Sequence, residues 1–274
     1  MVVFPNAKIN LGLRILGKRE DDFHNLETIF YPVKIKDALE IIQTEKKEDI
    51  TFTTTGKAIQ GNNTDNLCVN AFRLLKKDFP QIPPIKMHLH KHVPMGAGMG
   101  GGSADASAVL LLLNKKFKLN ISTEKLINYA LLLGSDCPFF IINKPCFASG
   151  RGEILQEINI NLSAYKIMIV HPGIHVNTGE AFSYLNAANF SPAGELAEQI
   201  KMDITLWKHN IKNDFEEVVF KNHVVIKEIK ERLYNEGAVY SSMSGSGSAV
   251  FGIFPLEAAI TKIKFPSHYF CQVI

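Results

Sequence analysis

The chain has 274 residues, which is enough for one large domain or two ordinary domains with real hydrophobic cores. Its composition, with 46% hydrophobic and 21% charged residues, is that of a soluble globular protein. The formal net charge of +3 is small and the basic residues are scattered, which argues against a nucleic acid partner. The four cysteines form no C-x-x-C pair, so we expect reduced thiols in a cytoplasmic protein.

The sequence also argues against a membrane location. The N-terminal stretch MVVFPNAKINLGLRI carries Lys8 among its apolar residues and has no small-residue cleavage site, so we expect no signal peptide. The longest apolar runs, AVLLLL and YALLLG, are far shorter than a bilayer span. We therefore expect no membrane partner.

Alternation of apolar and polar residues predicts the first strands. Residues 8–15 (KINLGLRI) alternate in this way, which predicts a half-buried strand with Lys8 and Asn10 on the face opposite the core. Residues two apart on a strand lie about 7 Å from each other, so these two polar side chains are expected side by side. Further strands are predicted over 26–33, 38–44, 50–54 and 85–91, and a helix capped by Asp65 or Asn66 is predicted to run to Leu75.

The C-terminal part of the chain is predicted to be more helical. Ser122 is expected to cap a helix that ends at Gly134, and Thr178 is expected to cap a short helix after a strand over 165–172. A longer helix is predicted near 222–236, followed by a glycine and serine turn within 241–254 and a strand. There is no Pro/Ser-rich linker, and we place a soft domain boundary that divides residues 1–155 from residues 156–274.

The most informative segment is PMGAGMGGGS at residues 94–103, in which five of the seven residues from Gly96 to Gly102 are glycine. Each glycine costs backbone entropy on ordering and fills no core volume, so packing does not explain them. A bare backbone lets N–H groups converge on an anion, and the apolar helix predicted directly afterwards points its positive end at the same place. The segment therefore predicts a loop that binds a polyphosphate.

Other glycine-rich patterns fit this segment less well. A Walker A loop would have lysine where Gly102 stands. Residues 96–101 satisfy G-x-G-x-x-G, but Pro94 interrupts the strand-to-turn transition and no acidic strand end follows in a βαβ unit. A flexible linker would have polar neighbours, whereas this segment lies between the strand-like IKMHLHK and an apolar helix.

Four segments, in order along the chain, resemble the motifs of the GHMP kinase superfamily: PNAKINLGL, PMGAGMGGGSADAS, GSDCPFF and SSMSGSGSAVFG. The segment KREDDFHNLETIF further resembles the branch that phosphorylates the 2-hydroxyl of 4-diphosphocytidyl-2-C-methyl-D-erythritol in the non-mevalonate isoprenoid pathway. The resemblance implies an α+β chain of two-layer α/β halves, with an N-terminal ATP-binding half and a C-terminal substrate half. It also implies an ATP-dependent kinase that uses Mg²⁺ and a small-molecule substrate with a cytidine diphosphate moiety.

The resemblance implies a catalytic pair. Asp136 would accept or orient the proton of the substrate hydroxyl, and Lys8 would keep that aspartate ionised and favour the developing alkoxide. Phosphoryl transfer needs such a place for the proton, together with aligned oxygens and neutralised charge. Taken alone, an aspartate before Cys-Pro also fits a turn cap, and Lys8 also fits a solvated strand residue.

The nucleotide site implied by the resemblance follows the glycine loop, and its residues are Pro94, Met95, Gly96, Ala97, Gly98, Met99, Gly100, Gly101, Gly102, Ser103 and Ala104. The usual spelling of the motif is GGGLGGGSSNA. Here Ala97 replaces glycine, Met99 leucine, Ala104 serine and Asp105 asparagine. Alanine at 97 requires a negative φ, which the structure can test. The Ser103 hydroxyl would lie near the phosphates or near Mg²⁺; we identify no carboxylate ligand for the metal and expect Mg²⁺ to arrive bound to ATP.

The substrate site implied by the resemblance is aromatic. Phe23 would stack on cytosine, His24 would hydrogen-bond its polar edge, and Phe182 would cover the other face, in contacts worth ~1–3 kcal/mol per base. Asn10 would bind the diphosphate or tetrol end. Tyrosine is usual at 23 and glycine at 22, so Asp22 raises the question of whether the turn differs. Phe182 also fits an ordinary core position of a helix.

Two other functions stay open at this stage. The first is a sister kinase of the superfamily that acts on mevalonate, homoserine or a sugar; the aromatic–histidine loop argues against it because those substrates have no base to stack. The second is a catalytically idle protein that binds nucleotide or RNA. The presence of both Lys8 and Asp136 argues against idleness, and the weak, dispersed charge argues against RNA.

Overall fold

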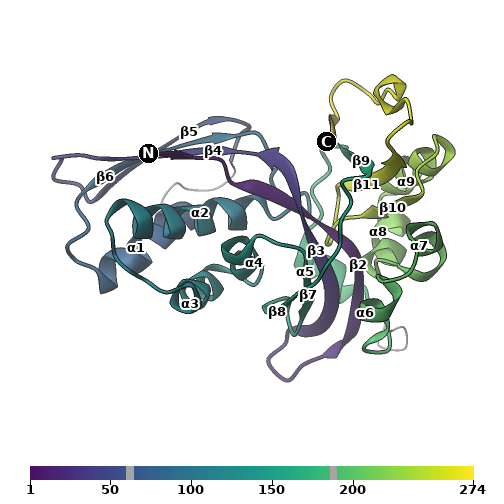
Figure 1. Ribbon diagram of the computed structural model, residues 1–274, viewed down its shortest axis with the longest axis horizontal. Coiled ribbons are helices and arrows are strands. Elements are labelled where there is room, and N and C mark those ends of the chain that lie inside the picture. Colours follow the sequence, from purple (N-terminus) through teal and green to yellow (C-terminus); the bar gives the residue numbers. More distant parts are fainter. Residues whose placement is uncertain (60–64, 186–189) are drawn as a thin grey trace. The chain divides into compact units, whose positions relative to one another are not determined.

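The computed structural model of the protein describes residues 1–59, 65–185 and 190–274, which form two compact units (Figure 1). Unit 1 contains residues 1–7, 34–95 and 100–144, and unit 2 contains residues 8–33, 96–99 and 145–274. The predicted boundary at residue 155 is a single break, whereas these units are discontinuous. The N-terminal segment of unit 2 joins its C-terminal part because strand β3 (His24–Lys36) pairs with strand β7 (Cys146–Ser149), with Thr28 opposite Ala148.

Unit 1 is a four-stranded sheet with helices on one face (Figure 1). The strand order is β1-β4-β6-β5, in which β5 and β6 are parallel and the other pairs are antiparallel. The strands are β1 (Val2–Val3), β4 (Ala38–Gln43), β5 (Ile50–Gly56) and β6 (Ile85–Lys91). The helices are α1 (Leu67–Asp78), α2 (Gly101–Lys116), α3 (Thr123–Leu133) and α4 (Cys137–Ile142).

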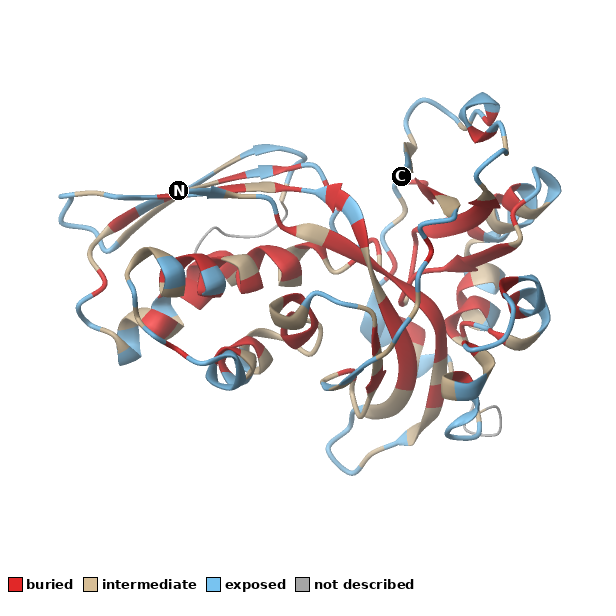
Figure 2. Cartoon of the chain, viewed as in Figure 1, coloured by how far each residue is buried: buried red, intermediate tan, exposed pale blue. Residues whose placement is uncertain are grey.

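Local signals in the sequence set the ends of the helices in unit 1. The side chain of Asn66 accepts a hydrogen bond of 2.9 Å from the backbone N–H of Cys68, so Asn66 caps α1. Ser122 caps α3 in the same way by accepting from Lys125, and the helix ends at Gly134. Both predictions are confirmed. The apolar sides of α1, α2 and α3 pack with the sheet in one core, and Figure 2 shows the buried residues along α2.

Unit 2 contains two four-stranded sheets. The first has the order β2-β3-β7-β8 and the second has the antiparallel order β10-β11-β9-β12. The strands of the first are β2 (Asn6–Lys18) and β3 (His24–Lys36), both of which extend into unit 1, with β7 (Cys146–Ser149) and β8 (Ile154–Glu157). Those of the second are β9 (Tyr165–His171), β10 (Tyr240–Met243), β11 (Val250–Pro255) and β12 (Phe270–Val273).

Five α-helices and a short 3₁₀ helix complete the described part of unit 2: α5 (Thr178–Ser183), α6 (Glu195–Gln199), α7 (Ile204–Asn210), α8 (Phe215–Asn222), α9 (Val224–Asn235) and η3 (Ile260–Lys262). Helix α9 confirms the helix predicted near 222–236 and packs on β10 and β11. The cap predicted for α5 is wrong by one residue. Asn177, not Thr178, accepts the backbone N–H of Glu180, and the Thr178 hydroxyl bonds that of Ser246 instead.

Strand β2 is more deeply buried than its alternation predicts. Ile9 and Leu11 are buried as expected, but Lys8 and Asn10 are also only 3% and 2% exposed. The predicted half-buried strand is therefore wrong for this segment, because polar residues of unit 2 cover its second face. Figure 2 shows β2 buried along most of its length.

Among the residues that the structure describes, no helix combines the length and the apolar character that crossing a bilayer would require. The combination of sheets and helices in both units confirms the predicted α+β class.

Candidate active site

Lys8 lies on β2 in a buried polar environment of unit 2. Its ammonium donates a hydrogen bond of 2.6 Å to the side-chain oxygen of Asn10 and lies 4.8 Å from the centre of the Phe30 ring. Its backbone N–H donates to the carbonyl of Met99, at 3.0 Å. The predicted catalytic lysine is thus joined both to the predicted substrate residue Asn10 and to the glycine loop.

Asn10 is the centre of a chain of buried hydrogen bonds in unit 2. Its amide nitrogen donates to the Thr28 hydroxyl at 2.8 Å, and that hydroxyl donates to the carbonyl of Gly12 at 2.6 Å. Its backbone N–H donates to the Ser244 hydroxyl at 3.2 Å. Because Asn10 is fixed from several sides, it holds the Lys8 ammonium in one position.

The glycine loop has the backbone that its sequence predicts. Gly96, Gly98 and Gly100 have φ of 61°, 74° and 66°, a region that side chains other than glycine rarely adopt. Ala97 is not among the residues with positive φ, which confirms the expectation for that position. At Gly98 a Cβ would also overlap the carbonyl oxygen of Ser244. Helix α2 begins directly after this loop, and the first N–H groups and positive end of a helix favour a negative charge.

Within unit 1, the start of α2 and the start of α4 are joined at Cys137, the residue after the predicted base Asp136. The Ser107 hydroxyl donates a hydrogen bond of 2.8 Å to the Cys137 carbonyl. Burial raises the pKa of the Cys137 thiol to about 11, while a hydrogen bond with Ser103 acts in the opposite direction. Asp136, which is half-buried, is therefore brought near the serine that ends the glycine loop.

A buried ion-pair triad lies under the first turn of α2. Lys91, at the end of β6, contacts the carboxylates of Asp37 and Asp105, the latter at 2.7 Å. All three side chains are at most 2% exposed. The second oxygen of Asp37 accepts from the backbone N–H groups of His92 and Val93, at 2.6 and 2.8 Å. The triad therefore fixes the chain on both sides of Pro94–Gly100.

One consequence of the triad is a pH-dependent stability. Burial raises the pKa of Asp105 from 3.8 to about 7, with Lys91 opposing the shift and Asp37 adding to it. Between about pH 4 and 7 the folded protein then holds a proton that the unfolded chain has lost, so the free energy of unfolding falls as the pH rises. Asp105→Asn removes this slope, and we expect the variant to gain about 1–3 kcal/mol relative to the parent between pH 5 and pH 8.

Urea unfolding of the parent and of Asp105→Asn at both pH values measures this difference. Parallel pH dependence in the two proteins would show that Asp105 does not titrate in this range.

The predicted base-binding residues gather in unit 2 around His24. The His24 ring stacks on Phe182 with centroids 4.5 Å apart and an interplanar angle of 14°. Phe23 is 51% exposed, and one side of its ring is covered by the guanidinium of Arg151 at 4.6 Å. Asp22 has a φ of 63°, so it takes the left-handed conformation that suits the usual glycine.

Several residues around the predicted site were not found from the sequence. Lys91 carried a usable signal, because it continues the apolar positions Ile85, Met87 and Leu89 on the buried side of β6. The contact of Ser244 with Asn10 left no signal in the sequence, since it joins residues 234 positions apart. Asp37 is likewise 54 residues from Lys91.

Comparison with known proteins gives a consistent result. The profile of the GHMP kinases N terminal domain matches residues 66–144, and that of the GHMP kinases C terminal domain matches residues 194–265. The 4-diphosphocytidyl-2-C-methyl-D-erythritol kinases of Bacteroides fragilis and Bacteroides thetaiotaomicron are 48% and 49% identical, over 99% of this chain and 98% of each relative.

Solved structures agree with these relatives. A crystal structure of 4-(cytidine 5'-diphospho)-2C-methyl-D-erythritol kinase superposes with a TM-score of 0.80 at 29% identity, over 92% of this chain and 90% of that one. A homoserine kinase from Cytophaga hutchinsonii shares the fold, with a TM-score of 0.68 at 14% identity over 98% and 93% of the two chains. The chain is therefore a small-molecule kinase that belongs to the 4-diphosphocytidyl-2-C-methyl-D-erythritol kinase family of the GHMP kinases.

Proposed function

We propose that the protein transfers the γ-phosphoryl group of ATP to the 2-hydroxyl of 4-diphosphocytidyl-2-C-methyl-D-erythritol, a step of the non-mevalonate isoprenoid pathway. The observation that carries this proposal is the junction of α2 with α4 in unit 1, where Ser103 and Ser107 contact Cys137 beside Asp136. It supports a carboxylate near the end of a phosphate-binding loop, which is what transfer to a hydroxyl needs. The full-length relatives carry the same activity in their name.

In the proposed reaction a bond forms between the substrate 2-hydroxyl oxygen and the γ-phosphorus, and the bond from that phosphorus to the β–γ bridging oxygen breaks. Asp136 accepts the hydroxyl proton, and the positive charge of Lys8 favours the developing alkoxide. Asn10 holds Lys8 through the 2.6 Å hydrogen bond between their side chains. ADP leaves with the electron pair of the broken bond.

We assign ATP to residues 94–104, where the loop backbone and the start of α2 favour bound phosphates. The part of the chain that the structure describes contains no group of three or more His, Cys, Asp or Glu side chains able to hold a metal ion. The residues present thus do not fit a metal held by the protein alone. We propose that Mg²⁺ enters with the nucleotide.

We assign cytosine to Phe23, His24 and Phe182. The exposed ring of Phe23 supports a stacking role, because an exposed aromatic face offers area to a base at little ordering cost. Burial lowers the pKa of His24 below its usual 6.5, with Lys18 contributing, so the ring is neutral at pH 7 and has one donor and one acceptor nitrogen. Such a ring suits the mixed donor and acceptor edge of cytosine. None of the four cysteines, which all lie in the described part of the chain, forms a disulfide bond, which supports a cytoplasmic location.

The test is a coupled assay of ADP release with ATP and Mg²⁺, using 4-diphosphocytidyl-2-C-methyl-D-erythritol, mevalonate, homoserine and galactose in parallel. We expect release only with the cytidylyl substrate. ADP release with one of the other three substrates would agree with the assignment of the phosphate loop but would contradict the assignment of the cytosine site. Bound nucleotide without release from any of the four would identify an idle binding protein.

A further inference from the structure

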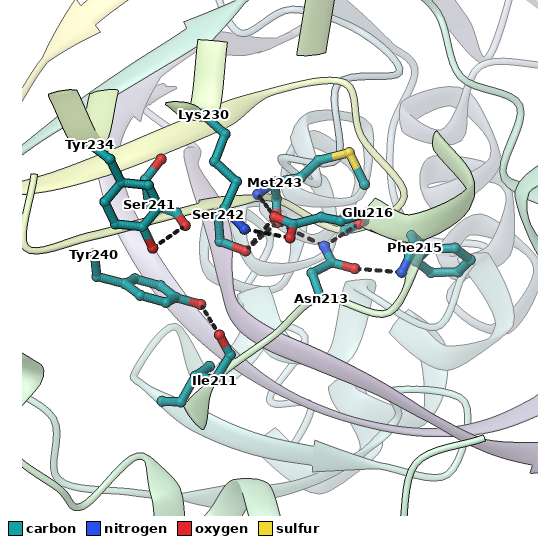
Figure 3. A network of polar contacts seen from close by, with 11 residues as sticks. Ile211, Asn213, Phe215, Glu216, Lys230, Tyr234, Tyr240, Ser241, Ser242 and Met243 are labelled. Atoms are coloured by element: carbon teal, nitrogen blue, oxygen red, sulfur yellow. Dashed lines mark hydrogen bonds and ion pairs between the residues drawn. The ribbon is translucent and has the colours of Figure 1, made fainter. Parts of the chain in front are cut away.

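Asn213, which lies between α7 and α8, is bonded to a turn that is distant in sequence (Figure 3). We call residues 244–248 the serine turn. The amide nitrogen of Asn213 donates to the carbonyls of Met243 and Gly245, both at 2.8 Å, and so holds the turn at its first residues. Its amide oxygen accepts the backbone N–H of Phe215 at 3.0 Å. Asn213 is 2% exposed, and each side-chain polar atom is used.

Glu216, in the first turn of α8, supports the strand that leads into the serine turn. One carboxylate oxygen accepts the backbone N–H of Met243 at 2.8 Å and the hydroxyl of Ser242 at 3.1 Å. The other oxygen accepts from the Lys230 ammonium at 2.5 Å. Figure 3 shows Asn213 and Glu216 both meeting the backbone at Met243.

The serine turn in turn packs on the first residues of the glycine loop, within unit 2. The Ser244 hydroxyl donates to the carbonyl of Gly98 at 2.8 Å, and the backbone N–H of Ala249 donates to the carbonyl of Ala97 at 3.1 Å. The Ser244 carbonyl approaches Gly98 so closely that no Cβ fits there. A displacement of the turn therefore displaces the backbone at residues 97 and 98.

Phe215, which lies two residues after Asn213, packs against one of the residues assigned to the base. Its ring meets Phe182 edge-to-face, with centroids 4.8 Å apart and an interplanar angle of 80°. Phe182 is the ring that stacks on His24. Phe215 is 2% exposed, so it fixes one side of Phe182 from the core.

We propose that residues 213–216 position both substrates of the kinase: Asn213 acts on ATP through the serine turn and the glycine loop, and Phe215 acts on the cytosine through Phe182. The part concerning Phe215 rests on the proposed base-binding role of Phe182. Neither side chain touches a substrate in this scheme, so both are positioning residues. Two neighbouring residues of one buried segment then control different Michaelis constants.

The first experiment uses Asn213→Asp, which keeps the acceptor for Phe215 but turns the donor toward Met243 and Gly245 into an acceptor. We expect the KM for ATP to rise about tenfold, with the KM for the cytidylyl substrate changed less than about twofold. Asn213→Ala, which removes the donors without adding repulsion, is expected to raise the KM for ATP about fivefold. Titration with a fluorescent ADP analogue checks the same loss without turnover.

The second experiment uses Phe215→Leu, which keeps an apolar side chain but removes the aromatic contact. We expect the KM for the cytidylyl substrate to rise about threefold to tenfold and the KM for ATP to stay within about twofold. If Phe215 acts through Phe182, the same substitution has little further effect in a Phe182→Leu background, which a double-mutant cycle measures.

Tyr234→Phe is the matched control, because it removes a hydrogen bond of 3.0 Å to the Ser241 carbonyl on β10 but touches neither the turn nor Phe182. We expect both Michaelis constants to be unchanged. Equal rises in both constants for Asn213→Asp and Phe215→Leu, or loss of folded protein in both Asn213 variants, would overturn the proposal. Parent protein inactive on the cytidylyl substrate would instead refute the proposed function.

Discussion

Replacing Asp136 with asparagine is expected to lower kcat by about 10²–10⁴-fold, because asparagine keeps the shape of the side chain but cannot accept the hydroxyl proton. The affinity for nucleotide should change less than about twofold, since the phosphates are assigned to backbone groups of the glycine loop and not to this carboxylate. Single-turnover measurements of phosphoryl transfer, together with titration of a fluorescent ADP analogue, separate the two quantities.

Glu124→Gln is the matched control for this experiment. Glu124 is an exposed acidic residue in the first turn of α3, in the same unit, and its loss should leave kcat unchanged. Unchanged turnover in Asp136→Asn would refute the assignment of Asp136 as the base. A large loss of nucleotide affinity would show that Asp136 supports the loop instead.

Replacing Lys91 with methionine is expected to produce the largest loss of stability. It removes the only cation of the buried triad and leaves Asp37 and Asp105 without their shared partner, a change that costs about 3–5 kcal/mol in comparable buried pairs. For a chain of 274 residues that corresponds to a fall of Tm by roughly 5–9 °C. Because His92 and Val93 are held by the same Asp37 carboxylate, the KM for ATP should also rise.

Lys86→Met on the same strand provides the comparison, since Lys86 is exposed and its replacement should change the free energy of unfolding by less than about 0.5 kcal/mol. Adding Asp105→Asn to Lys91→Met should recover part of the lost stability, because one buried charge is removed. If Lys91→Met is as stable as the Lys86 variant, the triad contributes no net stability.

Most of the fold of unit 1 could be predicted because its signals are local. Ser122 and Gly134 bound α3 through contacts within a few residues. The polar face of β2 could not be predicted correctly. Whether Lys8 is exposed depends on Thr28 and Ser244, which reach it through Asn10 from distant parts of the chain.

The helices α6 to α8 were not predicted from the sequence, for a second reason. Each has at most eight residues, too few for an apolar repeat to stand out from irregular sequence. Asn213 and Glu216 lie at the start of such a helix, and their partners are backbone groups about thirty positions away. Backbone partners leave no trace in side-chain patterning, so these roles emerge only from three-dimensional contacts.

The hydrogen bond from Ser244 to Gly98 has a consequence for the order of folding during synthesis. These residues are 146 positions apart, and Ser244 is 234 positions from Asn10, its other partner. A ribosome releases the first residues of the glycine loop many seconds before it completes β10 and the serine turn. Until then residues 97 and 98 lack the contacts from Ser244 and Ala249, so in the nascent chain the glycine loop acquires its final backbone only after residue 249 has emerged.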